Sequence, residues 1–261
     1  MIQPLAYVNP EAKIADNVVI EPFVTIHKNV VIEEGSWIGS NVTIMEGARI
    51  GKNCRIFPGA VVSAIPQDLK FEGENSILEV GNNVTIRECV TLNRGTKAMG
   101  KTKIGDHCLI MAYVHVAHDC MVGDNVILAN GVQLAGHVEI DDHTILGGLS
   151  AVHQFVKIGK HCMISGGSLV RKDVPPYSKA GREPLGYEGV NSVGLRRRGY
   201  DSKTINLIQD VYRWLFLRGL NNTQALRKIE EVVELTKERD EIIQFIKDSD
   251  RGIMKGFITH K

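Results

Sequence analysis

The chain has 261 residues, of which 43% are hydrophobic and 6% aromatic, an ordinary composition for one large domain or two unequal ones. Its 31 basic and 30 acidic residues nearly cancel, which argues against a broad binding surface for nucleic acid or membrane lipid. No segment approaches the roughly 20 apolar residues of a membrane span. The first residues also lack the basic and apolar regions of an export signal, so we expect a cytoplasmic protein.

An aliphatic residue recurs every six positions over the first two-thirds of the chain. The series runs without a gap from Val8 to Val62, resumes from Val80 to Leu92, and continues from Ile104 to Val170. Neither a helix of about 3.6 residues per turn nor a simple alternating strand produces this period. It predicts a solenoid, in which short strands bury their apolar edges only by stacking coil on coil.

The other positions of each hexad fit this prediction. The residue four places after the aliphatic one is small or β-branched, and it lies two places before the next aliphatic residue, so both side chains point to the interior. The place just before it favours Asn, Gly and His, which tolerate the positive φ of a corner. Four of the five cysteines occupy the small interior position and none forms a Cys-x-x-Cys pair, which predicts packing rather than metal binding.

This signature resembles that of the hexapeptide-repeat family of left-handed parallel β-helices. The resemblance implies triangular coils of three hexads. It is also the sole basis for the left-handed winding, since the general rule for parallel crossovers predicts a right-handed one. Residues 63–79 and 97–101 interrupt the aliphatic series without shifting its phase, and we expect loops there. The consecutive prolines in the run DVPPYSKAGREP, after Val170, predict the end of the prism.

From about residue 201 the apolar period becomes helical, with Ile205, Ile208 and Tyr212 on one face. A second helix is expected after Thr223, which fits an N-cap, and a third around residues 240–248. The fold class is therefore a β-solenoid with a small C-terminal α-helical domain. We place the β-helix domain at residues 1–190 and the helical domain at residues 191–261.

Seven of the nine histidines fall into two groups, whereas His27 and His260 have no suggestive neighbours. Three at the corner position are expected to be polar turn residues: His107, His143 and His161. In contrast, the hexads that begin at residues 116, 134 and 152 stack on one face if a coil has 18 residues. These hexads, together with His115 just before the first of them, carry four imidazoles. We expect all four within about 10 Å of one another: His115, His118, His137 and His153.

A histidine cluster indicates a metal site or a general base. The γ-type carbonic anhydrases, which have a similar β-helix, pair two zinc ligands with four residues between them, whereas two residues separate His115 from His118. Asp119 directly follows His118 and can orient it, as in a base relay. Gly136 offers a backbone N–H that a developing oxyanion can approach closely. We therefore favour a base and expect no metal.

Five motifs in order resemble the UDP-N-acetylglucosamine 3-O-acyltransferase family. They are QDLK at 67–70, HVAHDC at 115–120, LAGHV at 134–138, AVHQF at 151–155 and NSVGLRRRG at 191–199. The resemblance covers nearly the whole chain. It implies transfer of a long-chain 3-hydroxyacyl group from acyl carrier protein to the 3-hydroxyl of UDP-N-acetylglucosamine, the first step of lipid A biosynthesis.

The resemblance also implies residue roles. His118 would be the general base, Asp119 would support it, and the Gly136 amide would stabilise the oxyanion. The substrate-binding residues would be Asp68, Lys70, His115, His137, His153, Gln154, Gly166, Asn191, Arg197 and Arg198. No bound cofactor is expected, because the phosphopantetheine of acyl carrier protein holds the acyl group. The family further implies a homotrimer with active sites between subunits.

Three further expectations concern specificity and partners. Gly166 falls where the family sets acyl length, and a glycine there predicts a long donor. The basic residues of LRRRG at 195–199 are expected to bind phosphates or acyl carrier protein. Other basic residues nearby in sequence are expected to take part: Arg171, Lys172, Lys179 and Arg182. Asn93 replaces a histidine of some relatives, and residues 181–189 align loosely, which leaves the contacts of that stretch open.

Three alternatives remain at this point. A lipid A N-acyltransferase has an additional N-terminal domain, whereas the repeat here begins by Val8. A zinc lyase similar to the γ-type carbonic anhydrases would require stoichiometric zinc. A non-catalytic β-helix scaffold would lose no activity on replacement of His118.

Overall fold

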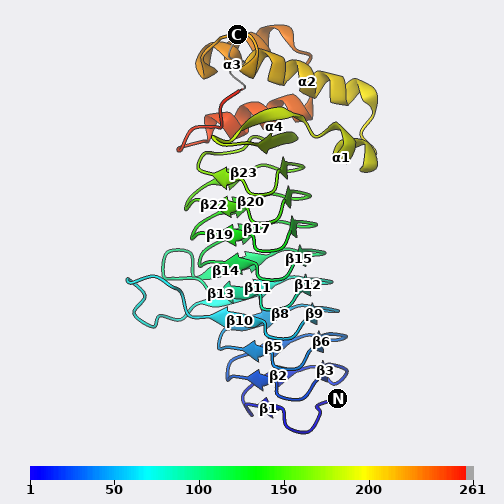
Figure 1. Ribbon diagram of the computed structural model, residues 1–261, viewed down its shortest axis with the longest axis vertical. Helices are drawn as coiled ribbons and strands as arrows, with labels where there is room; N and C mark the ends of the chain where they lie inside the picture. Colours follow the sequence, from blue (N-terminus) through cyan, green and yellow to red (C-terminus); the bar gives the residue numbers. More distant parts are fainter. Residues whose placement is uncertain (257–261) are drawn as a thin grey trace.

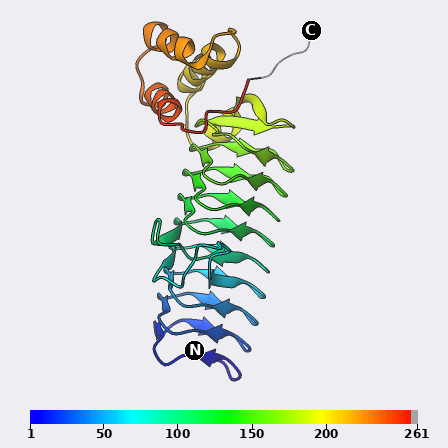
Figure 2. The same ribbon diagram turned by 90° about the vertical axis from the view of Figure 1, so that its left-hand side faces the viewer.

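The computed structural model describes residues 1–256, so His260 and the end of the predicted helical domain lie outside it. Short strands wind into a tall prism that begins at the N-terminus, and the helices sit at its C-terminal end (Figures 1 and 2). Within the described residues, no helix is long and apolar enough to cross a membrane.

The prism has three faces, each a sheet of parallel strands one coil apart, except that the last strand of the third sheet is antiparallel. Face 1 contains β1 (Tyr7–Val8), β4 (Thr25–Ile26), β7 (Thr43–Ile44), β10 (Val61–Ala64), β13 (Thr91–Asn93), β16 (His115–Val116), β19 (Gln133–Leu134), β22 (Ala151–Val152) and β25 (Leu169–Val170). Face 2 contains β2 (Lys13–Ile14), β5 (Val31–Ile32), β8 (Ala48–Ile50), β11 (Ile77–Val80), β14 (Lys101–Ile104), β17 (Met121–Val122), β20 (Glu139–Ile140) and β23 (Lys157–Ile158).

Face 3 is the longest sheet. It contains β3 (Val19–Ile20), β6 (Trp37–Ile38), β9 (Arg55–Ile56), β12 (Thr85–Ile86), β15 (Leu109–Ile110), β18 (Ile127–Leu128), β21 (Ile145–Leu146), β24 (Met163–Ile164), β26 (Ser178–Gly181) and β27 (Gly186–Val190). The chain passes from face 1 to face 2 to face 3 in every coil. We name the edges between them edge 1–2, edge 2–3 and edge 3–1.

The strand register confirms the expected coil of three hexads. Tyr7 pairs with Thr25 and Thr25 with Thr43, so paired residues are 18 apart. Val61 instead pairs with Thr91, and Thr91 with His115, at separations of 30 and 24 residues. These two coils are longer by multiples of six, which explains why the interruptions preserve the numerical phase.

The hexad pattern also predicts the core correctly. The aliphatic and small positions fill the interior, as at Ile26 and Val30, which are fully buried. Burying each such side chain stabilises the fold by about 1.5–3 kcal/mol. The corner position has positive φ, at Asn29 as at His137. Cys89 is the exposed cysteine at a corner, and the other four are buried: Cys54, Cys108, Cys120 and Cys162.

The prism extends slightly beyond the prolines that were expected to end it. Pro175 and Pro176 lie in the connection before β26, so they remove no ladder hydrogen bond. β26 then pairs parallel to β24, and β27 returns antiparallel to β26. This hairpin closes face 3 under the helices.

Four helices follow: α1 (Ser192–Arg197), α2 (Ser202–Phe216), α3 (Asn222–Val232) and α4 (Lys237–Lys247). The prediction of Thr223 as an N-cap is wrong, because Asn221 caps α3 and forms a capping box with Gln224. α1 was not expected from the apolar period, since it is short and buries only Leu195. The change from strand to helix falls between Val190 and Ser192, whereas the division into two domains stays a prediction.

Candidate active site

Edge 1–2 brings together the predicted catalytic residues and both loops. His118 and Asp119 occupy the corner between β16 and β17, and His137 occupies the same corner one coil later. Residues 65–76 join β10 to β11, and residues 94–100 join β13 to β14, so the two loops leave from this edge as well (Figure 1). The repeat therefore positions a polar cluster next to two irregular segments.

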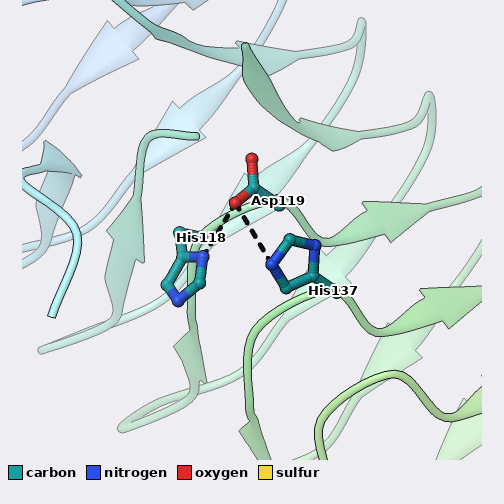
Figure 3. A group of neighbouring side chains, drawn as sticks. All are labelled: His118, Asp119 and His137. Atoms are coloured by element: carbon teal, nitrogen blue, oxygen red, sulfur yellow. Dashed lines mark hydrogen bonds and ion pairs between the residues drawn. The ribbon is translucent and has the colours of Figure 1, made fainter. Parts of the chain in front are cut away.

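Asp119 connects the two histidines (Figure 3). Its Oδ2 lies 2.8 Å from Nδ1 of His118 and 3.6 Å from Nε2 of His137. The His118 and His137 rings meet edge to face, with centroids 5.2 Å apart. The Asp119 side chain is fully buried and that of His118 is 9% exposed, so this contact forms largely out of water.

The Asp119 carboxylate is held in place by a loop residue. Thr96 donates to it from its backbone N–H at 2.9 Å and from its hydroxyl at 2.7 Å. Burial raises the pKa of Asp119, but the hydrogen bonds from Thr96 and His118 outweigh burial, and the net pKa is lowered. A charged carboxylate only accepts, so a neutral His118 carries its proton on Nδ1 and keeps the lone pair on Nε2.

Gly136 packs directly against the His118 ring. A Cβ atom at this position would lie 2.7 Å from Cε1 and 2.8 Å from Nε2 of His118, so any side chain would displace the imidazole. Among residues 1–256, the Gly136 N–H has no hydrogen-bond acceptor. A free N–H beside a free imidazole lone pair is the arrangement that an oxyanion and a proton acceptor require.

His115 lies beside His118 on face 1, with its Nδ1 2.8 Å from the Thr91 hydroxyl. Burial, and the neighbouring His118, lower the pKa of His115, which favours a neutral ring. Asn93 is buried and donates from Nδ2 to the carbonyl of Ile65. Here it fixes the start of the 65–76 loop.

Asp68 and Lys70 lie in that loop. The Lys70 N–H donates to Asp68 Oδ1 at 3.0 Å and the Phe71 N–H to the Asp68 carbonyl, a local turn. In the part of the chain that the structure describes, no hydrogen bond or ion pair joins either residue to the histidines. Leu69 between them is fully exposed.

A cavity of about 450 Å³ opens beside the cluster. Asp119 and His137 line it, together with Phe155, which stacks on His137 with centroids 4.7 Å apart. His153 is exposed, and its contacts are the Gln154 carbonyl and Arg251, not the other histidines. Of the four imidazoles expected to converge, His118 and His137 are in ring contact, and His115 is an electrostatic neighbour of His118. Within the described residues, no hydrogen bond or ring contact joins His153 to them, and its convergence with them stays a prediction.

Gln154 lies at edge 1–2, between β22 and β23, whereas the remaining predicted residues lie on other edges. Asn191 is buried at edge 2–3, where it caps α1 and donates to the His161 carbonyl, and Arg198 donates to the His143 carbonyl. Arg197 on the same helix is exposed. Gly166 is exposed at edge 3–1, where a Cβ would lie 3.1 Å from the Gly148 carbonyl. One chain thus does not bring these residues to His118.

Sequence reasoning missed three residues of the site. Phe155 had a usable signal, since it follows His137 by one coil at the same corner position. Thr96 lies within the hexad before the expected 97–101 loop and carries no distinguishing pattern. Arg251 comes from the C-terminal segment, which the hexad repeat does not reach.

The cluster also offers donors for a metal. Ligand atoms of His118, Asp119 and His137 lie within 4.8 Å of one another, and two histidines with a carboxylate form a known catalytic zinc set. Against this, Asp119 Oδ2 already accepts from His118 and from Thr96. A metal would have to break these hydrogen bonds.

Comparisons with known proteins agree with one another. Residues 173–254 match the family model for domain 2 of UDP-N-acetylglucosamine O-acyltransferase, residues 101–136 match the bacterial transferase hexapeptide model, and residues 2–97 match the GMPPB C-terminal domain model. The acyl-[acyl-carrier-protein]--UDP-N-acetylglucosamine O-acyltransferase of Sulfurihydrogenibium sp. is 57% identical over 97% of this chain and 93% of its own. That of Chlorobium phaeobacteroides is 61% identical over 96% of each. The chain belongs to the UDP-N-acetylglucosamine O-acyltransferase family.

Solved structures support the same assignment. The UDP-N-acetylglucosamine acyltransferase of Bacteroides fragilis superimposes with a TM-score of 0.96 and 49% identity over 98% of this chain and all of its own. The Acinetobacter baumannii relative gives 0.94 and 42% over 97% of this chain and 99% of its own. The left-handed parallel β-helix predicted from the repeat, followed by a small helical region, is confirmed.

Proposed function

We propose that this protein transfers an acyl group from acyl carrier protein to the 3-hydroxyl of UDP-N-acetylglucosamine, with His118 as the general base. The observation that carries the proposal is the His118 ring, which is held by Asp119 on one side and packed against Gly136 on the other. The family assignment supplies the substrates. The geometry supports the roles of the side chains.

In the proposed reaction, Nε2 of His118 removes the proton of the sugar hydroxyl as its oxygen attacks the thioester carbonyl. The negative charge that develops on the carbonyl oxygen is stabilised by the Gly136 N–H. The intermediate collapses to the ester, the C–S bond breaks, and the leaving thiolate takes the proton from His118. Asp119 stabilises the imidazolium between the two transfers, and such positioned base catalysis contributes about 10²–10⁴-fold.

The surface of the prism supports the proposal of a homotrimer. The outward side chains of face 3 form an apolar ladder that is only half-buried in one chain: Leu109, Ile127, Ile145 and Met163. Phe23, Tyr113 and Leu149 are exposed apolar residues along edge 3–1. With edge 3–1 at a threefold axis, face 3 of one subunit would cover face 1 of the next.

This packing would also complete the site. Edge 2–3 of one subunit, with Asn191 and Arg198, would come next to edge 1–2 of its neighbour, with His118. The residues proposed for the sugar nucleotide and for the base would then share one cleft. Asp68 and Lys70, on an exposed loop at edge 1–2, would reach into the same cleft. Sedimentation as a monomer at every concentration would contradict this arrangement.

The proposed surface for acyl carrier protein lies at the C-terminal end of the prism. A cavity of about 570 Å³ there is lined by Arg171, Lys172 and Arg182 together with apolar residues such as Leu169 and Leu185. Arg171 pairs with Glu183 at 2.6 Å, so part of this charge is locally compensated. Cations around an apolar pocket suit a partner that is acidic outside and delivers an acyl chain.

We further propose that Gly166 admits a long 3-hydroxyacyl chain, because the surface at this glycine is exposed and lacks a side chain. The positive φ of the corner belongs to the adjacent Gly167, so the turn itself does not require glycine at 166. The reaction would belong to the first step of lipid A biosynthesis in the cytoplasm. It would require no cofactor beyond the phosphopantetheine on the donor.

The test is an acyl-transfer assay with purified protein, UDP-N-acetylglucosamine and 3-hydroxyacyl carrier proteins of graded chain length, run beside His118→Ala. We expect transfer that is fastest with a long chain and falls by about 10²–10⁴-fold in the variant. Unchanged activity in a folded His118→Ala protein would exclude the base role. Replacement of Gly166 by Met should shift the preference to shorter donors.

A zinc lyase remains the second candidate because of the ligand geometry of His118, Asp119 and His137. Zinc analysis of the purified protein, with an assay of carbon dioxide hydration, separates the two. Stoichiometric zinc with hydration activity, and no acyl transfer, would favour the lyase.

A further inference from the structure

A residue of the C-terminal segment reaches the candidate active site. After α4 the chain returns to the last coils of the prism (Figure 2), where Arg251 lines the same cavity as Asp119 and His137. One guanidinium nitrogen, Nη2, lies 3.2 Å from Nδ1 of His153. The functional roles proposed above do not use this arginine.

Buried contacts fix the segment that carries Arg251. Asp173 is 1% exposed, and its Oδ2 accepts from the Ser249 hydroxyl at 2.6 Å. Its backbone N–H donates to the Gly252 carbonyl at 3.1 Å, and its carbonyl accepts from the Met254 N–H at 2.8 Å. Three bonds to one buried residue thus flank Arg251 on both sides. These hydrogen bonds to Asp173 therefore hold Arg251 beside His153.

The two neighbours of His153 make opposite demands on the same nitrogen. The carbonyl of Gln154 lies 3.1 Å from Nδ1 and can only accept, so this bond requires a proton on Nδ1. The Arg251 guanidinium can only donate, so its bond requires the lone pair on Nδ1. Only one of these bonds can form at a time. The choice decides whether Nε2 of a neutral His153 carries a hydrogen or a lone pair.

We propose that Arg251 is a positioning residue that selects the Nε2–H form of His153. A neutral His153, which is exposed, then offers a hydrogen-bond donor at Nε2 to an oxygen of the substrate, either a hydroxyl or a phosphate oxygen. Without the guanidinium, the Gln154 carbonyl draws the proton to Nδ1, and Nε2 becomes an acceptor. The identity of the substrate in this proposal rests on the proposed function, whereas the tautomer of the His153 imidazole does not.

The imidazole state is measured first, by ¹⁵N NMR of the histidine rings in the substrate-free protein, with His153 assigned from a His153→Gln sample. We expect the Nε2–H form in the wild type at neutral pH and a shift toward the Nδ1–H form in Arg251→Ala. Arg213→Ala, which removes an exposed arginine of α2, is the matched control and should leave the spectrum unchanged. A wild type in the Nδ1–H form overturns the proposal, whether or not any variant folds.

The kinetic test separates action through His153 from direct binding. Arg251→Ala should raise KM for UDP-N-acetylglucosamine by roughly tenfold with a smaller change in kcat, the loss of about one hydrogen bond. Glutamine at position 153 always presents an N–H, so Arg251→Ala should have little effect in a His153→Gln background. An equal tenfold effect in that background overturns the proposal. An inactive wild type would defeat the proposed function while the NMR result stands.

Discussion

Edges 1–2 and 2–3 of the prism use the same corner position for histidine but surround it differently. His137 at edge 1–2 faces a cavity and lies near the charged Asp119. His161 at edge 2–3 is 6% exposed and lies in a stack between His143 and Tyr177, with centroids 4.9 and 5.6 Å away. The repeat fixes where a corner histidine stands. What covers the corner decides whether it takes part in chemistry.

The cover of edge 2–3 comes from the helical region. Tyr200 places its hydroxyl 3.2 Å from Nε2 of His161, and Tyr177 donates to Glu241 of α4. Lys160 also pairs with Glu241, at 2.6 Å. These contacts join the prism to the helices, so edge 2–3 has a role in stability. Edge 1–2 instead has two loops and, beside its last coils, the segment that carries Arg251.

The largest expected effect is a difference in kcat between variants of two aspartates, one on each of these edges. Asp119→Asn should lower kcat by on the order of 10²-fold, because the neutral amide no longer stabilises the His118 imidazolium. The matched change Asp142→Asn at edge 2–3 should leave kcat unchanged, since an amide oxygen can still accept from the Asp124 N–H. Steady-state kinetics of both proteins measure the difference. Equal losses would show that the two edges are not functionally distinct.

A smaller loss is expected from the loop that supports Asp119. Thr96→Val removes the hydroxyl donor, so kcat should fall roughly tenfold, whereas Thr96→Ser should retain it. Loss of this donor also raises the pKa of Asp119, so the defect should grow as the pH falls. A kcat–pH profile for the three proteins tests both points. A serine variant as impaired as the valine variant would indicate a packing role.

Edge 2–3, which the helical region covers, should influence how the stability of the protein depends on pH. Burial, reinforced by His143, Arg198 and Lys160, lowers the pKa of His161 to about 4 from 6.5. The unfolded chain then binds the proton more readily, so stability is complete above pH 6.5 and declines as the pH falls toward 4. We expect about 2 kcal/mol less stability at pH 5 than at pH 7 from this residue.

His161→Phe should keep the stack but remove that part of the pH dependence. Urea unfolding at both pH values measures it, with His107→Phe, an exposed corner of the same edge, as the control. An unchanged pH slope in His161→Phe would mean that other groups govern acid stability.

The smallest expected effect concerns metal. If His118 acts as a base, dialysis against a chelator should leave acyl transfer unchanged, because Asp119 is already held by Thr96 and His118. Activity that is lost on chelation and restored by zinc would instead make edge 1–2 a metal site.

The fold follows from the sequence to an unusual degree, because one local rule repeats in every coil. The aliphatic series predicts the interior at Ile26 as well as at Val170, and both are fully buried. The helical region lacks such a rule, so the cap of α3 was misplaced and α1 was missed. Short helices depend on local capping and tertiary contacts, which an apolar period does not report.

The site was predicted only in part for a related reason. His118, Asp119 and His137 are neighbours along the repeat, so the coil length was enough to bring them together. Thr96 and Arg251 enter from irregular segments whose paths no period describes. Asn191 and Arg198 stand on another edge, and their proposed part in the site depends on a second chain.

The two ends of the prism differ in how they could join other molecules. β1 and β2 stand at the ends of their sheets, so their outer backbone groups have no neighbouring strand among the described residues. At the other end, the antiparallel β27 and the helices lie across the last coil. Head-to-tail stacking into a fibre would need an open sheet end on both sides, and β27 and the helices close the C-terminal side, which limits uncontrolled polymerisation of a shape that is otherwise suited to it.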